Sequence, residues 1–173
     1  MSFTLETARL RLRELVPDDI DFVADMLADP DVSRFYERSF SRSDAQAWLD
    51  RQLERYRRDG HGLWLVLDRA SEAPLGQVGL ILQEVEGARR PEIGWLLHRP
   101  FWGRGYATEA AAATRDAAFG HWHYPDVISL IRPENVASQR VARRIGMGAG
   151  RQVQFHGFTH IVFGVSVSPT DPG

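Results

Sequence analysis

Residues 92–109 read EIGWLLHRPFWGRGYATE, and this stretch decides the fold. Its first part, Glu92–Leu97, is typical of a strand, and a short turn leads directly into an alanine-rich helix predicted for Tyr106–Phe119. Backbone N–H groups at such a helix start have no intrahelical partners, so together with the helix dipole they favour an anion. Gly103 and Gly105 carry no Cβ, so the main chain of the turn can approach a ligand closely.

Arg104 stands between the two glycines, where its guanidinium suits phosphate oxygens. Taken alone, a Gly-x-Gly turn is more often a tight connection whose glycines serve packing. A Rossmann dinucleotide fingerprint needs a third Gly or Ala where Thr108 stands. A P-loop needs a lysine, whereas all 21 basic residues of this chain are arginines. These two nucleotide sites are excluded, and another phosphate-bearing cofactor stays open.

The composition narrows the class of protein further. The 173 residues suit one domain, and a net charge of −2 argues against a dedicated nucleic-acid binder. The absence of lysine excludes Schiff-base chemistry, and the absence of cysteine excludes disulfides and thiolate metal sites. His121 and His123 lack metal-ligand spacing on a helix, and we expect no metal site. With no signal-peptide pattern and no apolar run that could cross a membrane, we expect a cytoplasmic protein without membrane attachment.

The rest of the chain alternates between predicted strands and helices, with no repeat and no linker. The predicted strands are Thr7–Leu15, Leu63–Leu67, Leu75–Leu82 (or from Pro74), Glu92–Leu97, the fully apolar Val127–Ile131, Gln152–Phe155 and Thr159–Val167. The predicted helices are Pro17–Asp29, Ser41 or Ser43 to Asp59, Tyr106–Phe119 and Asn135–Ile145.

This order predicts a single α/β domain over residues 1–168, with a mixed, mostly antiparallel, twisted sheet flanked by helices. The first strands pair as a meander, while the strand–helix–strand unit over residues 92–131 requires a right-handed parallel crossover. Residues 169–173 are predicted to form a flexible C-terminal tail.

Four stretches together resemble one protein family. The run 92–109 resembles the acyl-CoA-binding motif of the GCN5-related N-acetyltransferase (GNAT) superfamily, in the wording of its RimJ/RimL-type branch. Residues 135–147, NVASQRVARRIGM, resemble a second block of that branch, and the stretches 7–13 (TARLRLR) and 75–79 (LGQVG) also match its usual wording. The matches occur in order across nearly the whole chain, which makes them far more specific together than singly.

Three positions depart from the family's pattern. Pro100 stands where the superfamily commonly has Gln or Arg, as is frequent in the RimJ/RimL-type branch. Met147 replaces the usual Phe, an exchange that a core tolerates. Ala142 stands where many relatives carry a tyrosine proposed as a general acid, so a tyrosine acid at that place is excluded.

The resemblance implies a GNAT-like fold and transfer of an acetyl group from acetyl-CoA to a primary amine, by direct attack in a ternary complex. Glu92 is the expected base, because an ammonium must lose a proton before it can attack. The alternative for Glu92 is a solvated glutamate at a strand end. Ser138 is expected to hydrogen-bond the leaving sulfur, or it is an ordinary serine in the first turn of its helix.

The same resemblance implies the contacts of acetyl-CoA. Main-chain groups of Trp95, Leu96 and Leu97 are expected to pair with the pantetheine amide and to face the oxyanion. Asn135 either contacts the pantetheine arm or caps its own helix. The full set expected at acetyl-CoA is Trp95, Leu96, Leu97, Trp102, Gly103, Arg104, Gly105, Tyr106, Ala107, Asn135, Ser138 and Arg140.

Two groups complete the expected site. Arg140, Arg143 and Arg144 either approach the phosphates or form a solvated helix face. The candidate contacts of the acceptor lie on the connection between the first two helices and are Phe35, Tyr36 and Glu37.

The acceptor stays open: a protein N-terminal α-amine, as the RimJ/RimL resemblance suggests, or a small-molecule amine. A non-catalytic acyl-CoA-binding or regulatory module on the same fold is the alternative function. A buried or misdirected Glu92 beside intact Gly103 and Gly105 would favour that alternative. The oligomeric state is open too, with a homodimer as one option.

Overall fold

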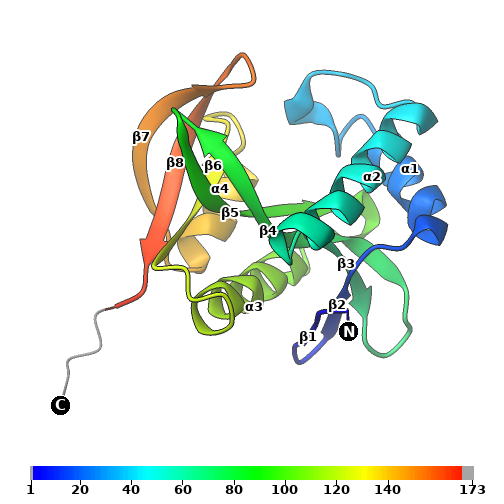
Figure 1. The fold of residues 1–173 in the computed structure, drawn as a ribbon. Helices are drawn as coiled ribbons and strands as arrows, with labels where there is room; N and C mark the ends of the chain where they lie inside the picture. The colour runs from blue at the N-terminus through cyan, green and yellow to red at the C-terminus, as the bar shows by residue number, and fades with distance from the viewer. Residues whose placement is uncertain (1, 169–173) are drawn as a thin grey trace.

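The strands join one eight-stranded sheet in the order β1-β2-β3-β4-β5-β6-β8-β7 (Figure 1). They are β1 (Thr4–Glu6), β2 (Leu10–Arg13), β3 (Leu63–Asp68), β4 (Pro74–Val85), β5 (Ala88–Leu97), β6 (Asp126–Ile131), β7 (Gly148–Phe155) and β8 (Phe158–Ser166). Neighbouring strands are antiparallel except for the parallel pair β5–β6, which confirms the predicted fold class. The computed structural model describes residues 2–168, so the tail expected at 169–173 lies outside the described residues.

Four helices in the described chain pack against this sheet. They are α1 (Ile20–Ala28), α2 (Arg42–Asp59), α3 (Tyr106–Gly120) and α4 (Val136–Arg144), with short 3₁₀ turns at Pro17–Asp19, Arg34–Tyr36 and Arg99–Phe101. A reciprocal pair of hydrogen bonds between Ser41 and Asp44 caps the start of α2, and Gly60 ends it in the left-handed region. Within residues 2–168, no helix combines the length and apolarity needed to cross a membrane.

The helices divide between the two faces of the sheet. On one face, Leu49 of α2 packs with Ile81 of β4. On the other, Ala110 and Ala111 of α3 pack with Ile93 of β5, where the small alanine side chains let the helix lie close to the strands. Figure 1 shows α1 and α2 on one side of β4 and β5, and α3 on the other. Successive residues of β4 and β5 therefore face different helical layers.

The N-terminal strand prediction is wrong in one respect. Residues 7–15 do not form one strand, because the chain turns at Thr7 between β1 and β2. The Thr7 Oγ1 accepts a hydrogen bond from the Leu10 N–H at 3.0 Å, a local bond that competes with strand extension.

The hairpin of β4 and β5 is longer than predicted. The polar residues 84–90 lie between the strands predicted at Leu75–Leu82 and Glu92–Leu97. In the structure they continue the antiparallel ladder, with a turn at Glu86 and Gly87. Most of this hairpin end is exposed, so its strands need no apolar face there. The strand β7 likewise begins at Gly148 rather than at Gln152.

Candidate functional site

The strands β5 and β6 separate after a single parallel pair, Glu92 opposite Ile128. In a regular parallel ladder, the Leu130 N–H beyond this pair would bond to the Ile93 carbonyl. Instead, the Leu130 N–H donates to Oε2 of Glu92 at 3.0 Å, and the Ser129 hydroxyl donates to the Ile93 carbonyl at 2.7 Å. Two side chains thus satisfy the backbone groups that the separating strands leave behind.

Main-chain groups of β5 face the opening between the two strands. The main-chain groups of successive strand residues point to opposite neighbouring strands. Because the Ile93 carbonyl points toward β6, the main-chain groups of Trp95 and Leu97 also point toward β6. Leu96 faces β4 and pairs with it. The Leu97 carbonyl already accepts a hydrogen bond from Nε1 of Trp102 at 2.8 Å. We expected main-chain groups of Trp95, Leu96 and Leu97 to contact a ligand. In the structure, only the main chain of Trp95 and the N–H of Leu97 remain for this role.

The glycine turn before α3 has a backbone that suits close approach. Gly103 and Gly105 have φ angles of 74° and 78°, in the left-handed region where other residues are strained. No atom lies within 4 Å of the place where a Gly103 Cβ would stand, so the backbone conformation and not crowding requires this glycine. Arg104 is exposed. Tyr106 and Ala107 form the first turn of α3, and their backbone N–H groups can donate hydrogen bonds to an anion.

Arg9 holds this turn, although sequence reasoning missed it. Its Nε donates to the Glu109 carboxylate at 2.6 Å, and its Nη1 donates to the Arg104 carbonyl at 3.0 Å. Its guanidinium also lies 4.6 Å from the centroid of the Tyr106 ring. The Thr7 hydroxyl and the Arg9 N–H donate to the same Glu109 carboxylate. The N-terminal motif therefore positions the glycine turn and the first turn of α3.

Asn135 and Ser138 meet at the start of α4. The Asn135 Oδ1 accepts a hydrogen bond from the Ser138 N–H at 3.1 Å, so Asn135 caps its helix, which was one of its two expected roles. The indole Nε1 of Trp95 donates to the Ser138 Oγ at 3.1 Å and links α4 to the open edge of β5. The Ser138 hydroxyl hydrogen stays available to a further acceptor. Arg140 is exposed on the same helix.

Glu92 is buried, with 8% of the residue exposed. Its Oε1 accepts a hydrogen bond from Nε2 of Gln83 at 3.2 Å, and its Oε2 accepts the one from Leu130. Burial raises the pKa of Glu92 from 4.5 to about 7, against the lowering effect of the two hydrogen bonds and of the Arg55 charge. Each carboxylate oxygen can accept two hydrogen bonds and here accepts one, so both keep a free acceptor position among the described contacts. Such a carboxyl group can take and release a proton near neutral pH.

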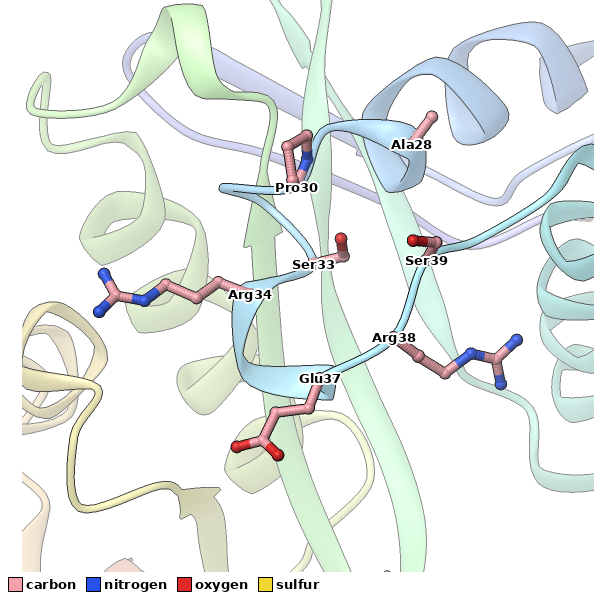
Figure 2. Close-up of a pocket in the computed structure, with 7 residues that line it drawn as sticks. All are labelled: Ala28, Pro30, Ser33, Arg34, Glu37, Arg38 and Ser39. Carbon is pink, nitrogen blue, oxygen red and sulfur yellow. The ribbon is translucent and has the colours of Figure 1, made fainter.

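The expected acceptor contacts lie on the loop between α1 and α2, which is fastened to the sheet. Arg132, just beyond β6, donates to the Phe35 carbonyl at 3.1 Å and to the Glu37 carboxylate at 2.8 Å. Figure 2 shows that Arg34 and Arg38 extend from this loop to opposite sides. The residues lining an open pocket on the loop are Ala28, Pro30, Ser33, Arg34, Glu37, Arg38 and Ser39.

Tyr36 forms part of an aromatic wall near Glu92. Its ring packs edge-on against Phe40 and Trp48, with centroids 5.5 and 5.8 Å away. Although 42% of the Tyr36 residue is exposed, desolvation of its hydroxyl and the Glu92 carboxylate raise the pKa of Tyr36 to about 12. The Trp48 Nε1 donates to Oε1 of Gln77 at 3.0 Å, which fixes the wall on β4.

The structure thus places the expected residues around the opening of the sheet. The glycine turn and Ser138 belong to the α3 and α4 layer, whereas Tyr36 belongs to the α1 and α2 layer. Ser129 was missed, because residues 127–131 were predicted as a fully apolar strand; a single serine within an apolar run was the available signal. It is 2% exposed, and its bond to the Ile93 carbonyl explains how a polar residue is accommodated there.

Comparisons with known proteins agree with this geometry. The family described as acetyltransferase (GNAT) domain matches residues 9–148. The chain is 34% identical over 151 residues to an uncharacterized protein, YkkB, of Bacillus subtilis strain 168, covering 87% of this chain and 88% of that protein.

Solved structures share the whole fold. The crystal structure of the acetyltransferase from Agrobacterium tumefaciens strain C58 matches with a TM-score of 0.84 and 30% identity, over 95% of both chains. RimL, a ribosomal L7/L12 α-N-protein acetyltransferase solved in complex with coenzyme A, matches with a TM-score of 0.76 over 95% of this chain and 98% of its own. At 14% identity, the match to RimL shows a common fold alone.

Replacing Ser129 should weaken the fold at the opening. Ser129→Ala leaves the buried Ile93 carbonyl without its donor, at a cost of about 1–3 kcal/mol in the free energy of unfolding. Urea denaturation measures this change in the free energy of unfolding. The matched control is Ser166→Ala, at an exposed position on β8. Equal stability of the two variants would contradict the role given to Ser129.

The stability of the protein should fall as pH rises through the titration of Glu92. Between pH 4.5 and about 7 the folded protein keeps a proton on Glu92 that the unfolded chain has lost, so folding is penalised above that range. Glu92→Gln, which stays neutral and still accepts from Leu130, should be more stable than the wild type at pH 8 by roughly 3 kcal/mol. That advantage should disappear below pH 4.5 in urea denaturation, whereas Glu84→Gln on the exposed part of β4 should show no such dependence. An advantage of equal size at both pH values would contradict the raised pKa.

Proposed function

Because this chain belongs to the GNAT acetyltransferase family, we propose that it is an acetyl-CoA-dependent N-acetyltransferase with Glu92 as its general base. A primary amine attacks the thioester directly while both substrates are bound. The observation that carries the proposal is the position of Glu92: a buried carboxylate with a pKa of about 7, at the point where β5 and β6 separate. A base with a pKa near the working pH combines the required ionisation with enough basicity to accept a proton.

Several residues fit acetyl-CoA as the donor substrate. The glycine turn and the first amides of α3, with Arg104 beside them, suit the pyrophosphate. The exposed Arg140 on α4 supplies a further cation for a phosphate. The main chain of Trp95 and the Leu97 N–H suit the pantetheine amide and the oxyanion. RimL, which shares the fold, is described in complex with coenzyme A.

Glu92 carries the proton chemistry. Its carboxylate takes a proton from the acceptor ammonium, directly or through one water, and leaves a neutral amine. The amine nitrogen then forms the N–C bond to the thioester carbonyl, the carbonyl oxygen carries the negative charge, and the C–S bond breaks as that charge collapses. The sulfur leaves as a thiolate, and the second proton of the amine passes to solvent or to the thiolate.

Ser138 assists the leaving group by hydrogen bonding. Its Oγ accepts from Trp95, so its O–H is available to donate to the sulfur. A thiol has a pKa of about 8.5, which makes the thiolate an acceptable leaving group without a strong acid. The core position of Ala142 agrees with a mechanism that needs no tyrosine there.

The acceptor is a protein N-terminal α-amine or a small-molecule amine. The wording of residues 92–109 resembles that of enzymes of the RimJ/RimL type, which favours the first of these. A non-catalytic acyl-CoA-binding module is the second candidate, and the burial of Glu92 is the observation that favours it. Turnover separates the two: release of free thiol from acetyl-CoA in the presence of amines supports the enzyme, and binding without turnover across a broad amine panel supports the module.

Replacing Glu92 should remove one ionisation from the pH–rate profile. In the wild type, kcat/KM should rise with pH through an apparent pKa of about 7 as Glu92 loses its proton. Glu92→Gln should lower kcat/KM about 100-fold at pH 7, the lower end of a general base's contribution, and less at high pH where more acceptor is already neutral. The assay is thiol release over pH 5.5–9.5, with Glu84→Gln as control. An unchanged profile in Glu92→Gln would remove Glu92 from the mechanism.

Arg9 should affect the binding of acetyl-CoA more than turnover. Arg9→Gln breaks the half-exposed ion pair to Glu109 and the bond to the Arg104 carbonyl, so the glycine turn loses its support. We expect acetyl-CoA binding to weaken by about 1 kcal/mol, which raises the KM for acetyl-CoA roughly fivefold and leaves kcat nearly unchanged. Arg11→Gln is the matched control, because Arg11 pairs with Glu6 and Glu72 away from the turn. A KM equal to that of the control would contradict the positioning role.

A further inference from the structure

Seven arginines make no ion pair within residues 2–168, and they fall into two groups. The first group, on α4 and the glycine turn, consists of Arg104, Arg140, Arg143 and Arg144. The proposed phosphates of acetyl-CoA account for Arg104 and Arg140. The second group, on α2 and the loop before it, consists of Arg34, Arg51 and Arg55. The donor substrate does not account for the second group, because α2 covers the opposite face of the sheet from α3.

Arg51 and Arg55 lie one helical turn apart on α2, on the Glu92 side of the sheet. Glu92 pairs with Ile81 across β4 and β5, and Ile81 packs in the same cluster as Trp48 of α2. The Arg51 guanidinium lies 5.8 Å from the Trp48 ring centroid. Arg55 Nη1 donates to Oε1 of Gln52, a neutral partner, at 3.3 Å. Glu92 and Asp59 act on the Arg55 charge, but neither forms an ion pair with it among the described residues.

Two guanidinium groups act on the surroundings of Glu92. The Arg55 charge acts on Glu92, and the Arg51 charge acts on the hydroxyl of Tyr36, which also senses Glu92. Burial and the neighbouring Arg51 charge lower the pKa of Arg55, so the two cations lie close enough to repel each other. Like charges one turn apart destabilise a helix, and an anion placed between them would relieve that cost.

Gln77 adds a neutral donor on the same face. Because the Trp48 Nε1 can only donate, the Gln77 Oε1 must face it, and the Gln77 NH₂ points elsewhere. That Nε2 is buried and has no hydrogen-bond partner among the described residues. A buried donor without an acceptor is costly, so a polar acceptor group is expected beside it.

We propose that the amine acceptor carries an anionic group, a carboxylate or a phosphate, which Arg51 and Arg55 bind while its amino group is presented to Glu92. This proposal rests on the proposed acetyltransferase function and names its substrate class. Guanidinium groups form bidentate, charge-assisted hydrogen bonds with both kinds of anion. Polyamines and aminoglycosides would meet like charges at this surface and are poor acceptors.

Pairs of amines with and without an anionic group test the proposal. The probes are alanine against alaninamide, the peptide amide Ala-Glu-Ala against Ala-Gln-Ala, and phosphoethanolamine against ethanolamine, so that a main-chain carboxylate, a side-chain carboxylate and a phosphate are separate arms. Thiol release from acetyl-CoA gives kcat and KM for each. In at least one pair, the wild type should prefer the anionic member by tenfold or more in kcat/KM.

The variant Arg51→Gln, Arg55→Gln should reduce that preference to less than twofold. The change should appear in the KM of the anionic acceptor, while the KM of acetyl-CoA stays the same. Because the Arg55 charge also lowers the pKa of Glu92, the two members of each amine pair are compared within the same variant. Arg57→Gln, on the same helix and paired with Glu54, is the matched control and should keep the preference. If thermal unfolding shows that the double variant has lost stability, the single variant Arg51→Gln, at an exposed position, replaces it in the test.

The possible outcomes distinguish failure of the anionic-acceptor proposal from failure of the proposed acetyltransferase function. Turnover without preference for anionic amines, or a preference that survives the double variant, would overturn the anionic-acceptor proposal alone. No thiol release with any of the six amines or with spermidine, despite binding of acetyl-CoA, would overturn the proposed function and with it this proposal.

Discussion

The separation of β5 from β6 is the constraint on which the rest of the structure depends. Opening a sheet exposes backbone groups that must find other partners or leave the fold unstable. Here a carboxylate takes the Leu130 N–H and a hydroxyl takes the Ile93 carbonyl, so the strands part without orphaned groups at the fork. The residue that satisfies one side of the fork is Glu92, which is also the only group there with proton chemistry near neutral pH among the described residues. The Glu92 side chain thus has both a structural role at the fork and the proposed catalytic role.

The two faces of the sheet give the proposed substrates different surroundings. On the α3 and α4 side, a glycine turn held by Arg9 offers backbone amides and arginines to phosphates. On the α1 and α2 side, aromatic rings and two arginines surround the approach to Glu92. Under the proposed function, an amine from the α1 and α2 side and a thioester from the α3 and α4 side meet beside Glu92, where β5 and β6 separate. The burial that raises the pKa of Glu92 also lowers the free energy of unfolding at neutral pH and above. Such a loss of stability is common at functional sites.

Much of the fold could be predicted because its signals are local. The strand, glycine turn and helix of residues 92–119 follow one another without interruption, and a parallel crossover is the topology that such a unit requires. The contacts that complete the site are not local: Arg9 reaches Glu109 across 100 positions, and Arg132 reaches the loop before α2 across 95. Ser129 was missed for a related reason, because a buried serine is explained only by the carbonyl that it binds on another strand. The polar hairpin end was missed because strand pairing there does not depend on apolar alternation.

The central claim is that Glu92 combines a structural bond at the fork with an ionisation near neutral pH. The most direct measurement is an NMR titration of the side-chain carboxyl carbons in protein labelled with ¹³C-glutamate, assigned by comparison with Glu92→Gln. We expect one glutamate resonance that titrates with a pKa of about 7 and is missing in the variant. If the resonance that disappears in Glu92→Gln instead titrates near 4.5, Glu92 has an ordinary carboxyl group and the account of the site is wrong.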